Sequence, residues 1–212
     1  MKGITFGNLH SYNNLSIILN SKEIGSPEAK VETIEIPGGH GVLDFTEFFG
    51  DVKYNNRTLT FEFSTIVPQS RFMTVFSEVQ NALHGKKMKI ILDDDPEWFY
   101  FGRIHVSEWK ADKRIGLLTI ECDCEPFKQS IYTTTVTKAV TSNATIALVN
   151  DKMPSVPTIT TNASFLIDFG GYHDIYPAGT FIIPELELHE GTNQIYVEGK
   201  GNISFTYRKG RL

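Results

Sequence analysis

The sequence predicts a mainly β protein in two parts, the first α+β and the second all β. Apolar and polar residues alternate with a period of two along most of the chain, as in 57–63, where Leu59, Phe61 and Phe63 share one face. Only one segment has the helical period. Composition changes near residue 128, since both tryptophans and both cysteines precede residue 125, whereas 133–161 holds nine threonines. We therefore expect a first domain at 1–128 and a second at 129–212.

The first part is expected to form a β-sandwich-like sheet with one helix and an extended β arm. Its predicted strands cover 33–36, 57–63, 88–92, 98–106 and 116–122. The last two would pair as a hairpin around Ala111, Asp112, Lys113 and Arg114.

The helix is predicted over 70–84. Its apolar stripe has spacings of four, three and four residues: Phe72, Phe76, Val79 and Leu83. Pro68 precedes it, Ser70 is the expected N-cap, and Gly85 stands where a left-handed residue would end it.

The second part contains short candidate strands separated by turn residues, a pattern typical of a sandwich or jelly roll. They cover 144–149, 157–161, 164–169, 179–183, 193–198 and 201–207. Gly199-Lys200-Gly201-Asn202 predicts a hairpin between the last two strands.

The 212 residues carry a formal net charge of −5 and have no basic stripe, which argues against specific nucleic-acid binding. No apolar run approaches the roughly 18 residues of a membrane span. The first residues do not form a secretory signal, so we expect folding in a cytoplasm.

No catalytic constellation is evident, and we expect no enzyme, no cofactor and no metal site. The six histidines have no metal-ligand spacing: His10, His40, His84, His105, His173 and His189. Cys122 and Cys124 are interpreted as reduced, partly buried thiols. The acidic run at 93–97 lacks the spacing of a calcium loop, and a tight turn is favoured.

The stretch 36–50 (IPGGHGVLDFTEFFG) is rich in glycine, but it has neither the lysine nor the following helix of a phosphate-binding loop. We interpret it as an extended arm in which glycines permit unusual backbone angles. Its apolar side chains either form an interface with a partner or cover the core of their own domain, and the interface is preferred. The interface candidates are Pro37, Gly38, Gly39, His40, Gly41, Val42, Leu43, Phe45, Phe48 and Phe49.

These features together resemble the distal tail protein family of long-tailed, non-contractile bacteriophages and related prophages. The matching segments, in order, are 1–8 (MKGITFGN), 31–41 (VETIEIPGGHG), 50–63, the helix, 93–100 and 122–127 (CDCEPF). The family commonly has an aspartate where His40 stands, and we expect His40 to shape a turn. The closing strands, from 191 to 212, are similar to the end of the family's second domain.

The resemblance implies a structural virion protein at the tail tip, made in the cytoplasm of the bacterial host. Family members form a sixfold ring in which first domains make the ring and galectin-like second domains point outward. The implied partners are other copies of the chain, the major tail tube protein, the tape-measure protein and the tail-tip or receptor-binding protein. The ring would leave a channel for DNA.

A second hypothesis is a carbohydrate-binding module that aids attachment to the host cell wall. Sugar sites usually stack an aromatic face on the sugar ring. The second part has no tryptophan, and its aromatic candidates are Tyr132, Tyr172, Tyr176, Tyr196 and Tyr207.

Overall fold

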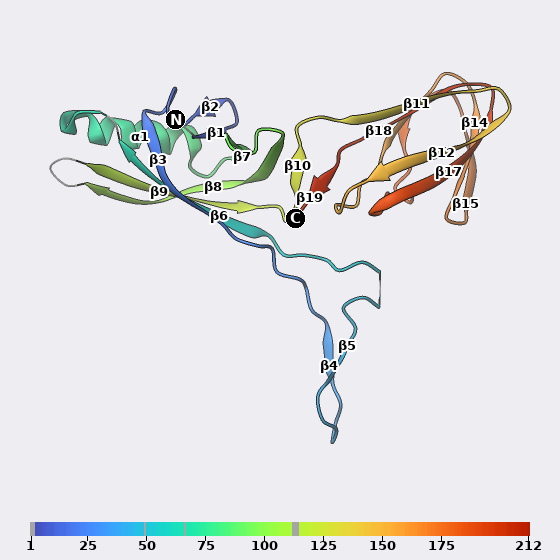
Figure 1. Ribbon diagram of the computed structural model, residues 1–212, viewed down its shortest axis with the longest axis horizontal. Helices are drawn as coiled ribbons and strands as arrows, with labels where there is room; N and C mark the ends of the chain where they lie inside the picture. Colours follow the sequence, from blue (N-terminus) through green and yellow to red (C-terminus); the bar gives the residue numbers. More distant parts are fainter. Residues whose placement is uncertain (1–2, 49, 66, 112–114) are drawn as a thin grey trace. The chain divides into compact units, whose positions relative to one another are not determined.

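The computed structural model describes residues 3–48, 50–65, 67–111 and 115–212. The chain divides into two compact units, Met1–Pro126 and Phe127–Leu212 (Figure 1). Strands dominate both units, which confirms the predicted mainly β class.

An antiparallel sheet forms the body of the first unit. From edge to edge it contains β2 (Leu9–His10), β1 (Ile4–Phe6), β7 (Lys87–Leu92), β8 (Trp98–Ala111), β9 (Gly116–Cys124), β6 (Arg57–Thr65) and β3 (Ile17–Ile24). The strands predicted at 57–63, 88–92, 98–106 and 116–122 are confirmed. β8 and β9 pair as predicted, with a bulge between Val106 and Glu108, and the expected turn residues Asp112, Lys113 and Arg114 lie outside the described residues.

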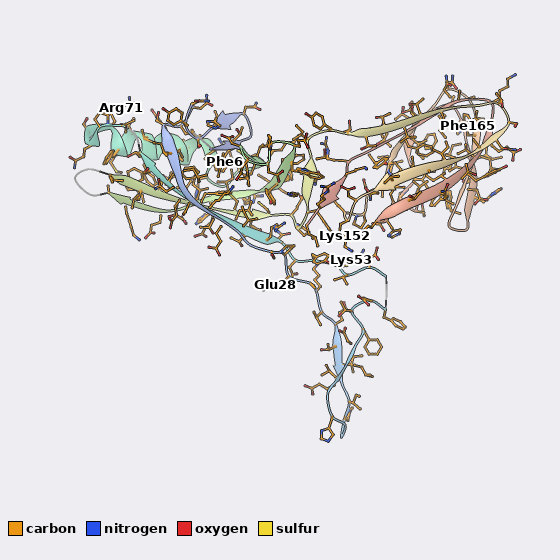
Figure 2. All side chains as sticks on the ribbon, viewed as in Figure 1. Phe6, Glu28, Lys53, Arg71, Lys152 and Phe165 are labelled. Carbon is orange, nitrogen blue, oxygen red and sulfur yellow. The ribbon has the colours of Figure 1, made fainter. Side chains whose placement is uncertain are left out.

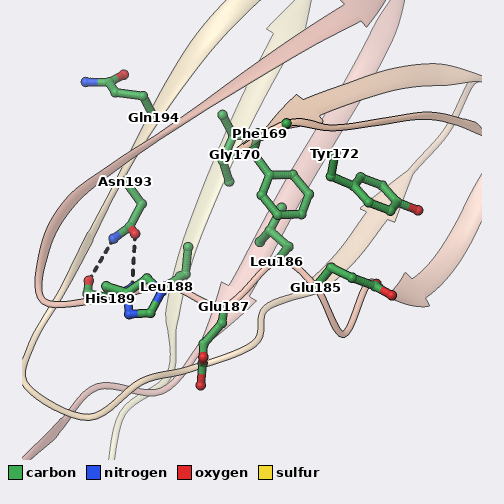
Figure 3. A pocket seen from close by; sticks show the side chains of 12 residues that line it. Phe169, Gly170, Tyr172, Glu185, Leu186, Glu187, Leu188, His189, Asn193 and Gln194 are labelled. Carbon is green, nitrogen blue, oxygen red and sulfur yellow. Dashed lines mark hydrogen bonds between the residues drawn. The ribbon is translucent and has the colours of Figure 1, made fainter. Parts of the chain in front are cut away.

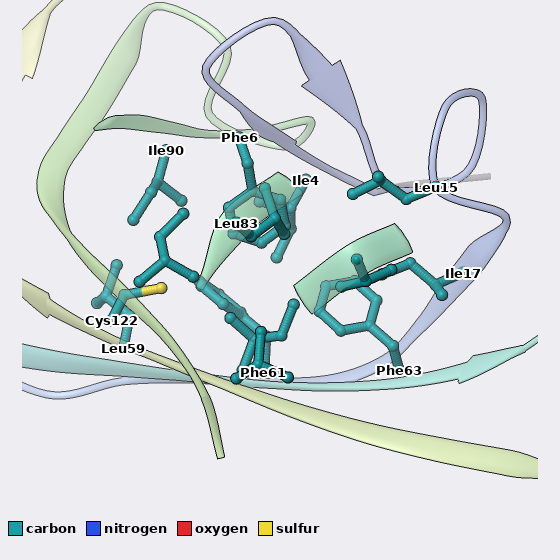
Figure 4. Packing of buried hydrophobic residues seen from close by; sticks show 14 of the residues in the cluster. Ile4, Phe6, Leu15, Ile17, Leu59, Phe61, Phe63, Leu83, Ile90 and Cys122 are labelled. Carbon is teal, nitrogen blue, oxygen red and sulfur yellow. The ribbon is translucent and has the colours of Figure 1, made fainter. Parts of the chain in front are cut away.

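This sheet curls so that its two ends face each other across the core. Phe6 on β1 lies 6.2 Å, between ring centroids, from both Phe61 and Phe63 on β6, although β7, β8 and β9 stand between the two strands in the sheet. Leu83 of the helix joins the same buried cluster (Figure 4). The sandwich-like first domain that the alternation predicts is therefore one sheet, which the helix helps to close.

The helix α1 (Phe72–Leu83) follows a 3₁₀ turn, η1 (Gln69–Arg71). The predicted N-cap at Ser70 is wrong, because the Arg71 N–H donates to the Pro68 carbonyl at 2.8 Å and winds Ser70 into the turn. Gly85 has φ +76° as expected. The helix buries Phe72, Val75, Val79 and Leu83, whereas Phe76 is half-buried with its ring 5.1 Å from that of Trp109.

Between β3 and β6 the chain forms a separate two-stranded hairpin of β4 (Thr33–Glu35) and β5 (Val42–Asp44). The sequence predicts the first of these strands but not the second. β5 is only three residues long and fully exposed, so its alternation is too short to distinguish from a loop.

The second unit is a jelly roll of two four-stranded antiparallel sheets. One sheet has the order β11 (Thr134–Val140), β18 (Gly201–Tyr207), β13 (Thr158–Thr161), β16 (Gly179–Ile182). The other has the order β12 (Asn143–Asn150), β17 (Gly191–Gly199), β14 (Phe165–Phe169), β15 (Tyr172–Tyr176). Successive strands alternate between the sheets except at β14 and β15, and β10 (Lys128–Ser130) pairs separately with β19 (Gly210–Arg211).

The hairpin predicted at 199–202 is wrong. β17 pairs with β12 and β14, whereas β18 pairs with β11 and β13, so the connection crosses from one sheet to the other. Gly199 and Gly201 pass close to the corner at 162–165, and a Cβ on Gly199 would lie 2.6 Å from the Phe165 ring. The glycines therefore allow two segments of the chain to pass close to each other, and they do not form a two-residue hairpin turn.

A true hairpin of this kind joins β14 to β15, a strand that the sequence analysis missed. Its two central residues, Gly170 and Gly171, have φ +54° and +86°, as a type I′ turn requires. The Gly-Gly pair is the signal that could have found β15. No helix of the described residues is long and apolar enough to cross a membrane.

Candidate assembly interface

The hairpin arm, which we define as residues 25–56, continues the ladder of β3 and β6 beyond the sheet. The Gly25 N–H donates to the Thr58 carbonyl at 2.9 Å, and the Lys30 N–H donates to the Lys53 carbonyl at 2.8 Å. Glu28 and Lys53 mark the two segments of the chain at the base of the arm (Figure 2). The first of these bonds holds the arm to its unit, and the second joins the two sides of the arm.

A tight turn closes the arm. The Gly39 N–H donates to the Ile36 carbonyl at 3.0 Å, with Pro37 and Gly38 between them. Gly38 has φ +75°, so proline and glycine occupy the positions that a type II turn favours. The expectation that glycines supply unusual backbone angles is confirmed here and at Gly41, which has φ +78°. His40 lies exposed in the bend that follows.

The hairpin of β4 and β5 has one apolar and one mixed face. Ile34 pairs directly with Leu43, which puts both side chains on one face, and they are 58% and 49% exposed. The other face carries the pair of Thr33 with Asp44 and the pair of Glu35 with Val42.

The apolar surface continues into the turn after β5. The Phe45 N–H donates to the Glu32 carbonyl at 2.7 Å, and the rings of Phe45 and Phe48 meet edge to face with centroids 5.8 Å apart. Phe48 is 71% exposed. Together with Val31, Glu32, Thr33 and Ile34 these rings line a hollow of about 580 Å³.

Among the described residues of the arm, none from 26 to 48 belongs to the core of the first unit or packs against it. The alternative that these side chains cover their own core is therefore not supported, and the interface candidates stay a prediction. Phe49, one of them, lies outside the described residues. Ile34 and Ile36, which the sequence analysis did not select, stand on the same strand or beside it and are also exposed.

The acidic run at 93–97 is a turn, as predicted. The Asp95 N–H donates to the Leu92 carbonyl at 3.0 Å, and Asp94 forms an ion pair with Lys22. The Asp93 carboxylate accepts from the Gly3 N–H at 2.7 Å and contacts His10 Nε2 at 3.0 Å. Burial opposes ionisation of Asp93, but these hydrogen bonds outweigh it and hold its pKa below the usual value.

Cys122 and Cys124 are free thiols on the inward face of β9 and are completely buried, more so than the sequence analysis expects. Burial, with smaller contributions from nearby acidic groups, raises the pKa of both thiols, that of Cys124 to about 12. They are packing groups of the core and not reactive nucleophiles.

Within the described parts of the chain, no group of three or more His, Cys, Asp or Glu side chains could hold a metal ion. His84 and His105 have ring centroids 4.8 Å apart, but His84 Nδ1 already accepts from the Val106 N–H. The other histidines are far apart in the sequence, and two of them, His10 and His173, contact aspartates.

The five tyrosines considered for sugar binding differ in exposure. Tyr207 is buried and its hydroxyl donates to the Val149 carbonyl at 2.7 Å, whereas Tyr132 and Tyr196 are exposed. Tyr172 and Tyr176 are half-buried and share a hydroxyl–hydroxyl hydrogen bond, which raises the pKa of Tyr176 to about 12.

Comparison with known proteins finds a solved structure with a similar fold. The sequence matches no protein-family model and no curated protein. The structure is similar to the crystal structure of the SPP1 Dit protein (gp 19.1), described as a paradigm of the hub adsorption apparatus in phages that infect Gram-positive bacteria. The TM-score is 0.74 with 12% sequence identity, and the likeness covers 100% of both chains. The resemblance indicated by the motifs is thus confirmed as a resemblance of fold, and this chain has the fold of a phage hub protein.

Proposed function

We propose that this protein is a structural hub at the distal end of a long, non-contractile phage tail, where copies of the chain close into a ring, a hexamer. The observation that carries the proposal is the likeness to SPP1 Dit over the full length of both chains. Because the likeness includes both units, it is more specific than a match of one common β domain would be.

The hairpin arm supplies a physical means of assembly. A ring requires heterologous contacts, in which one surface of a subunit meets a different surface of its neighbour. Exposed apolar clusters tend to mark such interfaces. The apolar face of the arm, together with the turn from Pro37 to Gly41 and the ring of Phe48, is the surface that we assign to this contact.

In this proposal the ring joins the tail tube and the tape-measure protein to the tail-tip or receptor-binding apparatus, and the protein resides in the virion of a phage or prophage. The first unit forms the ring and the second unit, a galectin-like sandwich, points outward. DNA crosses the lumen, and a chain with net charge −5 and no basic stripe would not retain it by its phosphates. The role is structural and not enzymatic.

The mass of the purified chain in solution tests this function. We expect a species of six times the 23.9 kDa chain mass, visible as rings by negative-stain microscopy. If the chain stays a monomer, antibody labelling of phage particles gives the second measurement. A monomer that is also missing from tail tips would refute the hub.

A further inference from the structure

A second surface of the molecule has the features of a ligand site. On the jelly roll, a hollow of about 590 Å³ is lined by the β14–β15 hairpin, the segment 185–189 and the start of β17 (Figure 3). Its volume lies within the range of about 300 to 1,000 Å³ that is common for small-molecule sites.

Aromatic rings form one wall of this hollow. Phe169 and Tyr172 face each other across the Gly170-Gly171 turn as a cross-strand pair, with ring centroids 5.3 Å apart and planes inclined by 31°. Figure 3 shows the two rings side by side, next to Leu186 and Glu185. Such a wall offers a broad apolar surface for stacking.

The aromatic wall also offers a hydrogen-bond donor. The hydroxyls of Tyr172 and Tyr176 bond to each other, and each hydroxyl carries one proton. Only one proton is used between them, so when Tyr176 donates to Tyr172, which lines the hollow, Tyr172 keeps its own proton for a ligand.

Two carboxylates also line the hollow. In the segment 185–189 side chains alternate, so that Leu186 and Leu188 are each 1% exposed in the core while Glu185 and Glu187 point outward. Neither glutamate has a hydrogen-bond or ion-pair partner within the described residues. Both are available as acceptors for donor groups of a ligand.

We propose that this hollow binds a neutral pyranose sugar, which stacks a C–H face on Phe169 and Tyr172 and donates hydroxyl hydrogen bonds to Glu185 and Glu187. The free phenolic proton of the tyrosine pair is donated to a hydroxyl oxygen of the sugar.

The chemistry of the lining selects this class over others. An anionic ligand such as a phosphate would meet two carboxylates and is repelled. A lysine or arginine side chain of a partner protein could pair with the carboxylates, but it has donors only and leaves the phenolic proton unmatched. A sugar both donates and accepts hydrogen bonds and has an apolar face. This site goes beyond the hub function and does not depend on ring assembly.

Saturation-transfer NMR on the full chain tests the proposal, with D-glucose, D-galactose and N-acetyl-D-glucosamine as separate probes. We expect transfer to at least one probe, with a dissociation constant on the order of 1 mM. Phe169→Ala removes the stacking ring and should weaken binding about tenfold. Glu185→Gln changes an exposed side chain without affecting the fold and should weaken it about fivefold.

Tyr132→Ala serves as the matched control, since it removes an exposed tyrosine of the same unit outside the hollow and should leave binding unchanged. Three results would each overturn the proposal. They are no transfer to any probe, transfer that survives both Phe169→Ala and Glu185→Gln, and displacement of the sugar by a short arginine peptide that binds more tightly.

Discussion

Removing the apolar face of the hairpin arm should prevent ring assembly while leaving each subunit folded. The perturbation is the triple substitution Ile34→Ser, Leu43→Ser and Phe48→Ser. All three side chains are exposed in the single chain, so their loss should change the free energy of unfolding by no more than about 0.5 kcal/mol.

The magnitude follows from the exposed fractions. Burial of a complete Leu, Ile or Phe side chain contributes about 1.5 to 3 kcal/mol. Ile34, Leu43 and Phe48 are 58%, 49% and 71% exposed, so a contact that covers them gains about half to two thirds of that from each. The sum is about 3 to 5 kcal/mol per contact, which corresponds to a weakening of each contact by about 100-fold or more.

The assay is the mass distribution of the assembled protein at equal chain concentration, with thermal unfolding measured in parallel. Glu35→Ala provides the matched control, because Glu35 stands on the opposite face of the same strand and does not line the hollow of the arm. We expect the control to form rings and the triple variant to remain a monomer with an unchanged melting temperature.

Mixing the triple variant with the wild-type chain sharpens this test. A subunit without the apolar face can still accept the arm of its neighbour but cannot donate its own, so a closed ring requires a functional arm on every copy. In an equal mixture, about 2% of randomly drawn sets of six chains contain wild-type chains only, and only these sets could close into a ring. If the arms instead paired isologously in dimers, about 25% of the pairs would contain two wild-type chains and stay intact. The reasoning would be refuted by triple-variant rings of unchanged yield, or by a triple variant that melts early because the arm packs on its own unit.

Three further predictions concern the first unit. Gly102→Ala should destabilise it by about 1 to 3 kcal/mol in denaturant titration, because a Cβ there would lie 2.5 Å from Cys124 Sγ, whereas Lys110→Ala on the same strand should have little effect. Ellman's reagent at pH 8 should modify neither cysteine of the native chain and both after unfolding, since burial raises the pKa of both thiols; rapid native labelling would contradict their packing role. Because the folded pKa of Asp93 is lowered, its stabilising contribution is present above about pH 4 and is lost as the pH falls through that folded value. The free energy of unfolding of Asp93→Asn should therefore fall less steeply with pH than that of the wild type below about pH 4. Equal slopes for the two proteins would show that the Asp93 carboxylate does not cause the acid loss of stability.

Local patterns in the sequence predict the strands and the helix of this fold better than they predict which strands pair with one another. The alternation at 57–63 identifies β6, and the spacing from Phe72 to Leu83 identifies α1, because each pattern reflects burial against one surface. The motif Gly199-Lys200-Gly201-Asn202 satisfies a hairpin equally well, yet its flanking strands belong to different sheets. Which sheet a strand joins depends on residues far away in the chain, and a turn sequence does not encode them.

The two candidate sites show the same limit. The sequence marks the arm through its glycines, but the apolar face exists only because the register pairs Ile34 with Leu43. A shift of one residue would place one of these side chains on the opposite face, so the four-residue turn at Ile36–Gly39 fixes the surface as well as the direction of the chain.

The hollow on the jelly roll was not visible in the sequence for a different reason. Its aromatic wall depends on a Gly-Gly turn that brings Phe169 beside Tyr172, and its acidic rim comes from a segment outside the named strands of the sheets. Glu185 and Glu187 face outward because Leu186 and Leu188, with which they alternate along the segment, are anchored in the core. Packing of the leucines therefore positions the carboxylates, so a substitution such as Leu186→Ala should disturb the rim without altering either acidic group.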